Sequence, residues 1–332
     1  MNLEEIKSIL QDEKSYRFNQ VFSAIFKQLA SSWQNTNLSQ NLKKKLEEKA
    51  SLEIQAEIIG SKKQNIKKAL ITLGPGEKIE TVLISHQSGR NTVCVSSQIG
   101  CPLKCSFCAS SKSKFKRNLN YSEIITQIIF WARILKDENK KVTNIVFMGM
   151  GEPLLNYQSV DKAVRLINDE SAFNISSRKI SISTVGIIDG INKLATRRPS
   201  LNLAFSLHAP DQDLRQRIIP SAKNYPLQSI FLAISKYIRK TKRKVMIEYA
   251  LFDKINDDTS LAYQLAYILK KNFANNFVLN LIAGNPVFNY KPSSHKQIYM
   301  FKKVLEEKNI EVVERYRFGR NIKGACGQLV YK

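Results

Sequence analysis

Residues 92–108 read TVCVSSQIGCPLKCSFC, and the rest of the sequence is best interpreted outward from them. The first five, Thr92–Ser96, form a short run typical of a buried strand. Three cysteines follow in the next loop, Cys101, Cys105 and Cys108, with the spacing C-x3-C-x2-C. A strand that leads into closely spaced thiols predicts a metal-binding loop at the carboxyl end of that strand.

Beyond this loop, apolar runs and amphipathic segments alternate. The predicted strands are Asn144–Met148, Ile180–Ser183, Leu201–Ser206, Val245–Leu251 and Phe277–Ile282. The predicted helices are Ser122–Lys136, Ser159–Asn168, Leu227–Ile238, Leu261–Lys271 and Ser294–Glu307. With Thr92–Ser96 this makes about six βα units, and such alternation indicates a parallel α/β fold. We therefore expect a partial (β/α)6 TIM-like barrel, two units short of a closed one.

The region before the barrel has a different pattern. Residues 1–75 are predicted to be helical and basic, with helices Leu3–Leu10, Phe18–Leu29 and Leu38–Leu52. The composition changes at Gly74-Pro75-Gly76, and a short strand, Ile79–Ser85, follows. We expect an accessory domain over residues 1–75 and a core domain over residues 76–332.

Unusual residues recur where the predicted strands end. Because the carboxyl ends of parallel strands meet at one face of a barrel, these side chains are candidates for a shared site. The set comprises Gly151, Glu152, Ser183, Ser206, Leu207, His208 and Asn285.

The cysteine spacing favours an iron–sulfur cluster. Cysteine thiolates hold such clusters, and three protein ligands on a four-iron cluster leave one iron open for a substrate or cofactor. The alternative is zinc, which needs a fourth ligand such as Cys94, Cys326 or a histidine. Zinc sites more often use paired C-x2-C units, so we favour a [4Fe-4S] cluster.

The chain is strongly basic. Lys and Arg number 52 against 28 Asp and Glu, a net charge of +24, which predicts a polyanionic partner, nucleic acid above all. Codon bias in an AT-rich genome is an alternative cause, since Lys and Asn are both abundant. Residues 1–15 lack an apolar signal segment and no long apolar run follows, so we expect no membrane association and a cytoplasmic location. Structural disulfides are not expected there.

A strand, a C-x3-C-x2-C loop and a partial β/α barrel together resemble the radical S-adenosylmethionine (SAM) superfamily. Phe107, beside the last cysteine, matches the usual aromatic position. The resemblance implies that Cys101, Cys105 and Cys108 hold a [4Fe-4S] cluster whose open iron binds SAM.

Five blocks in order make the resemblance narrower. They are residues 94–101 (CVSSQIGC), 148–156 (MGMGEPLLN), 182–186 (ISTVG), 206–210 (SLHAP) and 325–329 (ACGQL). Together they resemble the RlmN/Cfr family of RNA adenine methyltransferases over nearly the whole chain.

This resemblance implies a mechanism with two SAM molecules. Cys326 takes a methyl group from one SAM, and a radical made from the second removes hydrogen from the S-methyl group. The resulting carbon radical adds to adenine, and Cys94 resolves the adduct with formation of a Cys94–Cys326 disulfide. Glu80 matches the proton acceptor, and the strand-end set given above matches the SAM contacts. A flavodoxin or ferredoxin is the implied electron donor.

The pair Glu152-Pro153 is similar to RlmN proteins, which implies methylation at C2 of an adenine in 23S rRNA and possibly tRNA. The basic helical region is then expected to grip RNA, and the protein to be a monomer. Two departures, Asn321 in place of Asp and Ala222 in place of Asn, leave a diverged RNA target as an alternative. A Cfr-like enzyme that methylates C8 is the other alternative. Other radical SAM chemistry would not need the Cys94 and Cys326 thiols, and a zinc-containing RNA-binding protein is the non-enzymatic alternative.

Overall fold

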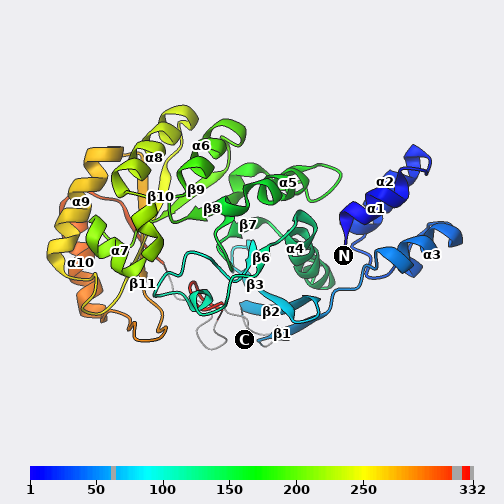
Figure 1. Ribbon diagram of the computed structural model, residues 1–332, viewed down its shortest axis with the longest axis horizontal. Helices are drawn as coiled ribbons and strands as arrows, with labels where there is room; N and C mark the ends of the chain where they lie inside the picture. Colours follow the sequence, from blue (N-terminus) through cyan, green and yellow to red (C-terminus); the bar gives the residue numbers. More distant parts are fainter. Residues whose placement is uncertain (61–64, 316–323, 330–332) are drawn as a thin grey trace.

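The protein folds around one curved sheet of ten strands in the part of the chain that the computed structural model describes, residues 1–60, 65–315 and 324–329 (Figure 1). In spatial order the strands are β1 (Ala56–Ile59), β2 (Ile66–Gly74), β3 (Glu77–Ser85), β4 (Asn91–Cys94), β7 (Asn144–Phe147), β8 (Ile180–Thr184), β9 (Asn202–Ser206), β10 (Val245–Leu251), β11 (Phe277–Ala283) and β12 (Val312–Arg315). A separate two-stranded ladder pairs β5 (Gln98–Ile99) with β6 (Arg117–Asn118).

Neighbouring strands from β4 to β12 pair in parallel, and helices connect them. The connecting helices are α4 (Tyr121–Asp137), α5 (Tyr157–Asn168), α6 (Ile188–Arg197), α7 (Gln212–Ile218), α8 (Leu227–Thr241), α9 (Thr259–Phe273) and α10 (His295–Glu307). Short 3-10 turns lie at Trp33–Asn35, Ala109–Ser111, Pro153–Asn156, Ser177–Lys179 and Pro220–Asn224. In Figure 1 the helices follow one another around the outside of the sheet. The predicted partial (β/α)6 barrel is confirmed.

The sequence forms these elements for simple reasons. Helix α4 begins with a capping box, in which the Asn120 side chain accepts from the Glu123 backbone and the Glu123 side chain accepts in return. Strands β10 and β11 are almost wholly buried and apolar, as expected for parallel strands covered on both faces.

The prediction that residues 1–75 are all helical is wrong for its last third. Helices α1 (Leu3–Leu10), α2 (Ser15–Phe26) and α3 (Gln40–Lys49) are present, but strands β1 and β2 follow them. Strand β1 pairs antiparallel with β2, and β2 pairs antiparallel with β3. Strand β2 is hard to predict from the sequence because Lys67 and Lys68 look like surface residues. Both are in fact buried beside acids: the Lys67 ammonium lies 2.8 Å from Glu138, and the Lys68 ammonium lies 2.6 Å from Glu80. The domain division at residue 75 stays a prediction.

The N-terminal helices pack on the barrel rather than apart from it. Their apolar side chains belong to the same buried cluster as those of the barrel helices. The Arg133 guanidinium on α4 donates to the Ala30 and Leu52 carbonyls, and the Leu3 amide donates to the Ser122 hydroxyl. Among the described residues, no helix combines the length and apolar character that a membrane span requires.

Three further elements escaped the sequence patterns. Helix α6 contains Gly190, where a Cβ would lie 2.5 Å from a Leu154 side-chain atom, so close helix packing demands the glycine. Helix α7 is only seven residues long, and edge strand β12 is only partly buried. Short or half-exposed elements give weak periodicity.

The backbone at the end of β7 lies too close to β4 for any side chain at Gly149. A Cβ there would lie 2.7 Å from the Val95 carbonyl oxygen and 2.8 Å from the Ser96 amide. We expect Gly149→Ala to lower the free energy of unfolding by about 1–3 kcal/mol, measured by urea unfolding. Gly74→Ala is the matched control, because a Cβ at Gly74 meets nothing within 4 Å. Equal effects of the two substitutions would contradict this packing.

Candidate active site

The carboxyl ends of six parallel strands open into one pocket. Each of the five sequence blocks contributes at least one residue to it. Its lining includes Cys101, Cys105, Cys108, Gly151, Glu152, Ser183, Ser206, His208, Asn285 and Cys326.

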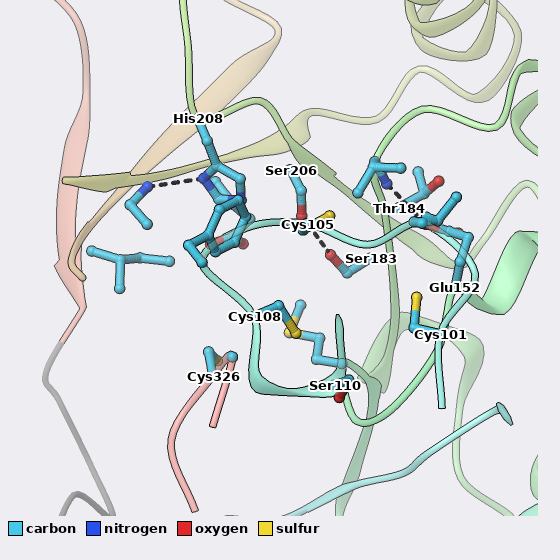
Figure 2. A pocket seen from close by; sticks show the side chains of 18 of the residues that line it. Cys101, Cys105, Cys108, Ser110, Glu152, Ser183, Thr184, Ser206, His208 and Cys326 are labelled. Atoms are coloured by element: carbon cyan, nitrogen blue, oxygen red, sulfur yellow. Dashed lines mark hydrogen bonds between the residues drawn. The ribbon is translucent and has the colours of Figure 1, made fainter. Parts of the chain in front are cut away.

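The three cysteines of the loop after β4 stand around the wall of this pocket (Figure 2). Burial raises the pKa of all three thiols, that of Cys101 to about 12. In the described part of the chain, no three His, Cys, Asp or Glu side chains converge tightly enough to hold one metal ion.

Backbone contacts hold the cysteine loop in place. Gly100 turns the chain at φ +73°, where a Cβ would lie 2.6 Å from the Lys114 carbonyl oxygen. The Ser106 amide donates to the Ile218 carbonyl (2.9 Å), which ties the loop to the end of α7. The Phe107 ring lies edge-on to His208, with 4.9 Å between ring centroids. Phe107 therefore forms part of the pocket wall, at the position the sequence singled out.

Glu152 is buried at the end of β7 with both carboxylate oxygens held by backbone. Its oxygens accept from the Leu154 amide (3.0 Å) and the Val185 amide (2.9 Å). Burial raises the pKa of Glu152 to about 7 in spite of these bonds. Gly151, just before it, has φ +96°, and a Cβ there would collide with the Gln98 side chain. Both Gly149 and Gly151 are thus required by packing within the protein.

The residues that end β8 and β9 lie side by side. The Ser183 and Ser206 hydroxyls are 3.2 Å apart (Figure 2). His208 has φ +58°, and its Nδ1 accepts from the Ala250 amide (3.0 Å). Burial, helped by Arg215, lowers the pKa of His208 to about 3, so the ring is neutral. Leu207 was predicted to contact SAM, but its side chain is fully buried in the apolar core and does not line the pocket.

The C-terminal segment brings Cys326 to the cysteine loop. The Asn285 amide group donates to the Cys326 carbonyl (3.0 Å), the Ala109 amide to the Gly327 carbonyl (2.7 Å), and the Ser110 hydroxyl to the Leu329 carbonyl (2.6 Å). Cys326 lies on the pocket wall, beside Cys108 in Figure 2.

Cys94 and Glu80 lie behind the pocket wall. Cys94 is buried against Val82, Met150 and Leu329, and burial together with nearby Cys326 raises the pKa of its thiol. Both cysteines are free thiols. Glu80 is buried and forms an ion pair with Lys68, and it does not line the pocket.

Two charged pocket residues were missed by the sequence analysis. Glu248 on β10 accepts from Asn280 (2.9 Å) and pairs with Arg315 of β12 (3.1 Å), while its Oε2 is buried without a partner. Burial raises the pKa of Glu248. The sequence did contain a signal for this residue: Glu248 is the one carboxylate within the apolar run VMIEYAL, and a carboxylate inside a buried strand indicates a functional position.

Of the two departures noted in the sequence, Asn321 lies outside the described residues. Ala222 is buried against Leu214, Ile218 and Ile219 and does not line the pocket. An amide at position 222 would be part of the packing beneath α7, so its loss changes no contact inside the pocket.

The pocket residues fit the groups that the sequence pattern implies. Three thiols supply the donor set of an iron–sulfur cluster. Two pocket residues keep buried polar atoms without partners, Asn285 Oδ1 and Glu248 Oε2, and these remain for a polar ligand. Buried polar groups of folded proteins nearly always have partners, so these atoms indicate a site built for something it binds.

Comparisons with known proteins agree with this geometry. Residues 95–265 match the model of the radical SAM superfamily. The chain is 42% identical over 333 residues to a probable dual-specificity RNA methyltransferase RlmN of Dictyoglomus thermophilum, which covers 99% of this chain and 94% of the relative. A relative of the same description from Protochlamydia amoebophila, numbered RlmN 2, is 42% identical and covers 96% of this chain and 89% of its own.

A solved structure agrees as well. The crystal structure of a radical SAM methyltransferase from Sphaerobacter thermophilus superposes with a TM-score of 0.93 at 34% identity, and the match covers 99% of this chain and 97% of that one. The resemblance drawn from the motifs is confirmed: the chain belongs to the radical SAM superfamily and, within it, to the RlmN family.

Proposed function

We propose that this protein methylates an adenine base in RNA, at C2, with Cys326 as the methyl carrier. One observation carries the proposal: the Cys326 thiol, more than 200 residues from the cysteine loop, lines the same pocket as Cys101, Cys105 and Cys108. The relatives are named as dual-specificity RNA methyltransferases, which supports an RNA substrate. By the family pattern the target is 23S rRNA, with tRNA as a second candidate, and both are cytoplasmic.

Cys101, Cys105 and Cys108 would hold a [4Fe-4S] cluster with one iron open. Glu152 and the other strand-end residues would hold SAM in the same pocket. When bound and reduced by a flavodoxin or ferredoxin, these groups would supply radical chemistry that removes a hydrogen atom. The proposed SAM contacts are Gly151, Ser183, Ser206, Leu207, His208 and Asn285. Leu207 would make its contact through its backbone, because its side chain is buried in the core.

Cys326 acts first as a nucleophile. Its thiolate sulfur forms a bond to the methyl carbon of SAM, the sulfonium–methyl bond breaks, and S-adenosylhomocysteine leaves. The hydrogen bond from Asn285 fixes the Cys326 backbone at the pocket wall. Desolvation by the surrounding protein raises the pKa of the Cys326 thiol, and the positive charge of Arg315, which pairs with Glu248, acts in the opposite direction.

Cys94 and Glu80 would complete the reaction. The sulfur of Cys94 would bond to the Cys326 sulfur as the bond between the Cys326 sulfur and the transferred carbon breaks. That carbon keeps the electron pair and takes up a proton, and a Cys94–Cys326 disulfide remains. Glu80 would accept the adenine proton. Because Lys68 already binds its Oε1 at 2.6 Å, that role requires this ion pair to open or to pass the proton on.

RNA recognition would rest on the positive surface. With a net charge of +24 the protein attracts phosphates, and the target base must leave its stack because C2 is hidden within it. We assign the grip on RNA to the helical accessory region over residues 1–75, in a monomer. Lys43 is excluded from that grip, because it is buried and its ammonium donates to the Gln34 carbonyl.

A Cys326→Ala variant tests the methyl carrier. We expect RNA methylation to fall at least about a thousandfold, because the nucleophile is gone, while iron and sulfide content stay at the wild-type level. Cys94→Ala is the matched comparison: it should still take a methyl group on Cys326 but accumulate a covalent protein–RNA adduct. Mass spectrometry of the protein reads both. RNA methylation at the wild-type rate by Cys326→Ala would exclude the proposed carrier.

Glu152 gives a prediction on pH. The pKa of Glu152 in the folded protein is about 7, above its ordinary value of 4.5. As the pH rises from about 4.5 to 7, the unfolded chain gives up this proton first, so the unliganded folded protein loses stability over that range. In protein without cluster or SAM, Glu152→Gln should be about 2 kcal/mol more stable than wild type at pH 8, because the variant does not have to bury an ionised carboxylate. The loss of one accepting oxygen makes this gain smaller than the pKa shift alone would give. Urea unfolding near pH 5 should show almost no gain.

The exposed Glu48→Gln provides the control for this comparison, with the same chemical change at the surface. A difference between Glu152→Gln and wild type that is the same at pH 5 and pH 8 would contradict the buried, ionised carboxylate.

A further inference from the structure

Arg215 is the most deeply buried charge near the pocket. It lies on α7 and is completely inaccessible to solvent. Its Nε donates to the Leu207 carbonyl (3.1 Å), and its Nη2 donates to the Val185 (2.6 Å) and Ser206 (3.1 Å) carbonyls. These carbonyls belong to the ends of β8 and β9, so the guanidinium is fixed behind the mouth of the barrel.

Its positive charge has no counter-charge among the described residues. No carboxylate forms an ion pair with Arg215 there, and Nη1 is buried without a hydrogen-bond partner. The face of the Phe205 ring, 5.2 Å away, is its only cation–π contact in the described structure. An isolated buried charge costs several kcal/mol, so proteins normally keep one only where something compensates it.

Helix α7, which carries Arg215, packs against the cysteine loop. The Ser106 amide donates to the Ile218 carbonyl (2.9 Å) at the end of this helix. Cys105 packs against the apolar cluster that contains Leu214 and Ile218 of the same helix. Helix α7 therefore holds Arg215 next to the cysteine loop.

We infer that Arg215 is the fixed counter-cation of the cluster that the three cysteines hold, and that it favours the reduced cluster. This inference rests on the proposed function. With three thiolate ligands the cluster is an anion, and one electron from the flavodoxin- or ferredoxin-type donor adds one more negative charge without a proton. A buried positive charge stabilises the more negative state more strongly, which raises the reduction potential.

Arg215 is thus a positioning and electrostatic residue that acts through the cluster. Charge-assisted hydrogen bonding from Nη1 toward the Cys105 sulfur or a neighbouring sulfide would satisfy the donor that the protein leaves unpaired. Such second contacts to sulfur are among the known means by which proteins tune cluster potentials.

The test compares Arg215→Gln with Arg215→Lys in cluster-loaded protein without SAM. An anaerobic redox titration followed by electron paramagnetic resonance (EPR) measures the midpoint potential. For Arg215→Gln we expect at least a tenfold shift toward the oxidised cluster, which is 59 mV for a one-electron couple. Arg215→Lys keeps the charge and should stay within threefold of wild type. An unchanged potential in Arg215→Gln would overturn the inference, even if its affinity for SAM fell.

Arg133→Gln is the matched control. Arg133 is also an arginine that donates to backbone carbonyls and has a buried nitrogen, Nε, without a partner, but it lies on α4 under the N-terminal helices. Its loss should lower stability and leave the potential unchanged. An equal shift in both variants would mean that structural damage, and not the Arg215 charge, moves the potential.

A wild-type measurement covers the case in which Arg215→Gln does not fold. In protein labelled with 15N-arginine, pulsed EPR of the reduced cluster should show a 15N coupling from Arg215. The coupling should persist in Arg315→Lys, which removes the arginine that lines the pocket. Its absence from wild type would overturn the inference. A wild-type protein that incorporates no [4Fe-4S] cluster would instead refute the proposed function, so the two failures are distinguishable.

Discussion

Parallel pairing from β4 to β12 is the constraint on which the rest of the structure depends. A parallel register sends every carboxyl end to the same face, so residues distant in the chain reach one pocket. The pairing must be close for this to work. At Gly149 the β7 backbone passes so near Val95 and Ser96 that no side chain fits, and this contact sets the cysteine loop against the end of β7.

A second feature is the surplus of polar and charged groups around that mouth. Among the residues that the structure describes, Glu152 is buried with two backbone donors and no cation, and Glu248, Asn285 and Arg215 each keep an atom without a partner. Each of these groups costs stability in the isolated protein. Their placement is explained if bound groups complete them: an ammonium for Glu152, and a cluster anion for Arg215. The pocket is therefore organised before it binds.

Much of this was predictable from the sequence, because the informative signals were local. The alternation of strands and helices predicted the barrel, and the cysteine spacing with the strand-end residues predicted which segments meet. The strand β2 was missed because Lys67 and Lys68 look like surface residues, although tertiary contacts with Glu138 and Glu80 bury them. Arg215 was missed for a similar reason: its meaning lies in three carbonyls of other segments, and no sequence spacing reveals these.

The central claim is that this pocket methylates C2 of adenine in RNA, and nucleoside mass spectrometry tests it most directly. RNA from a deletion strain and from its parent would be separated into 23S rRNA and tRNA, digested and compared. The account predicts that 2-methyladenosine disappears from at least the 23S rRNA of the deletion strain and returns when the gene is restored. Loss of 8-methyladenosine instead, or no change in either nucleoside, would contradict it.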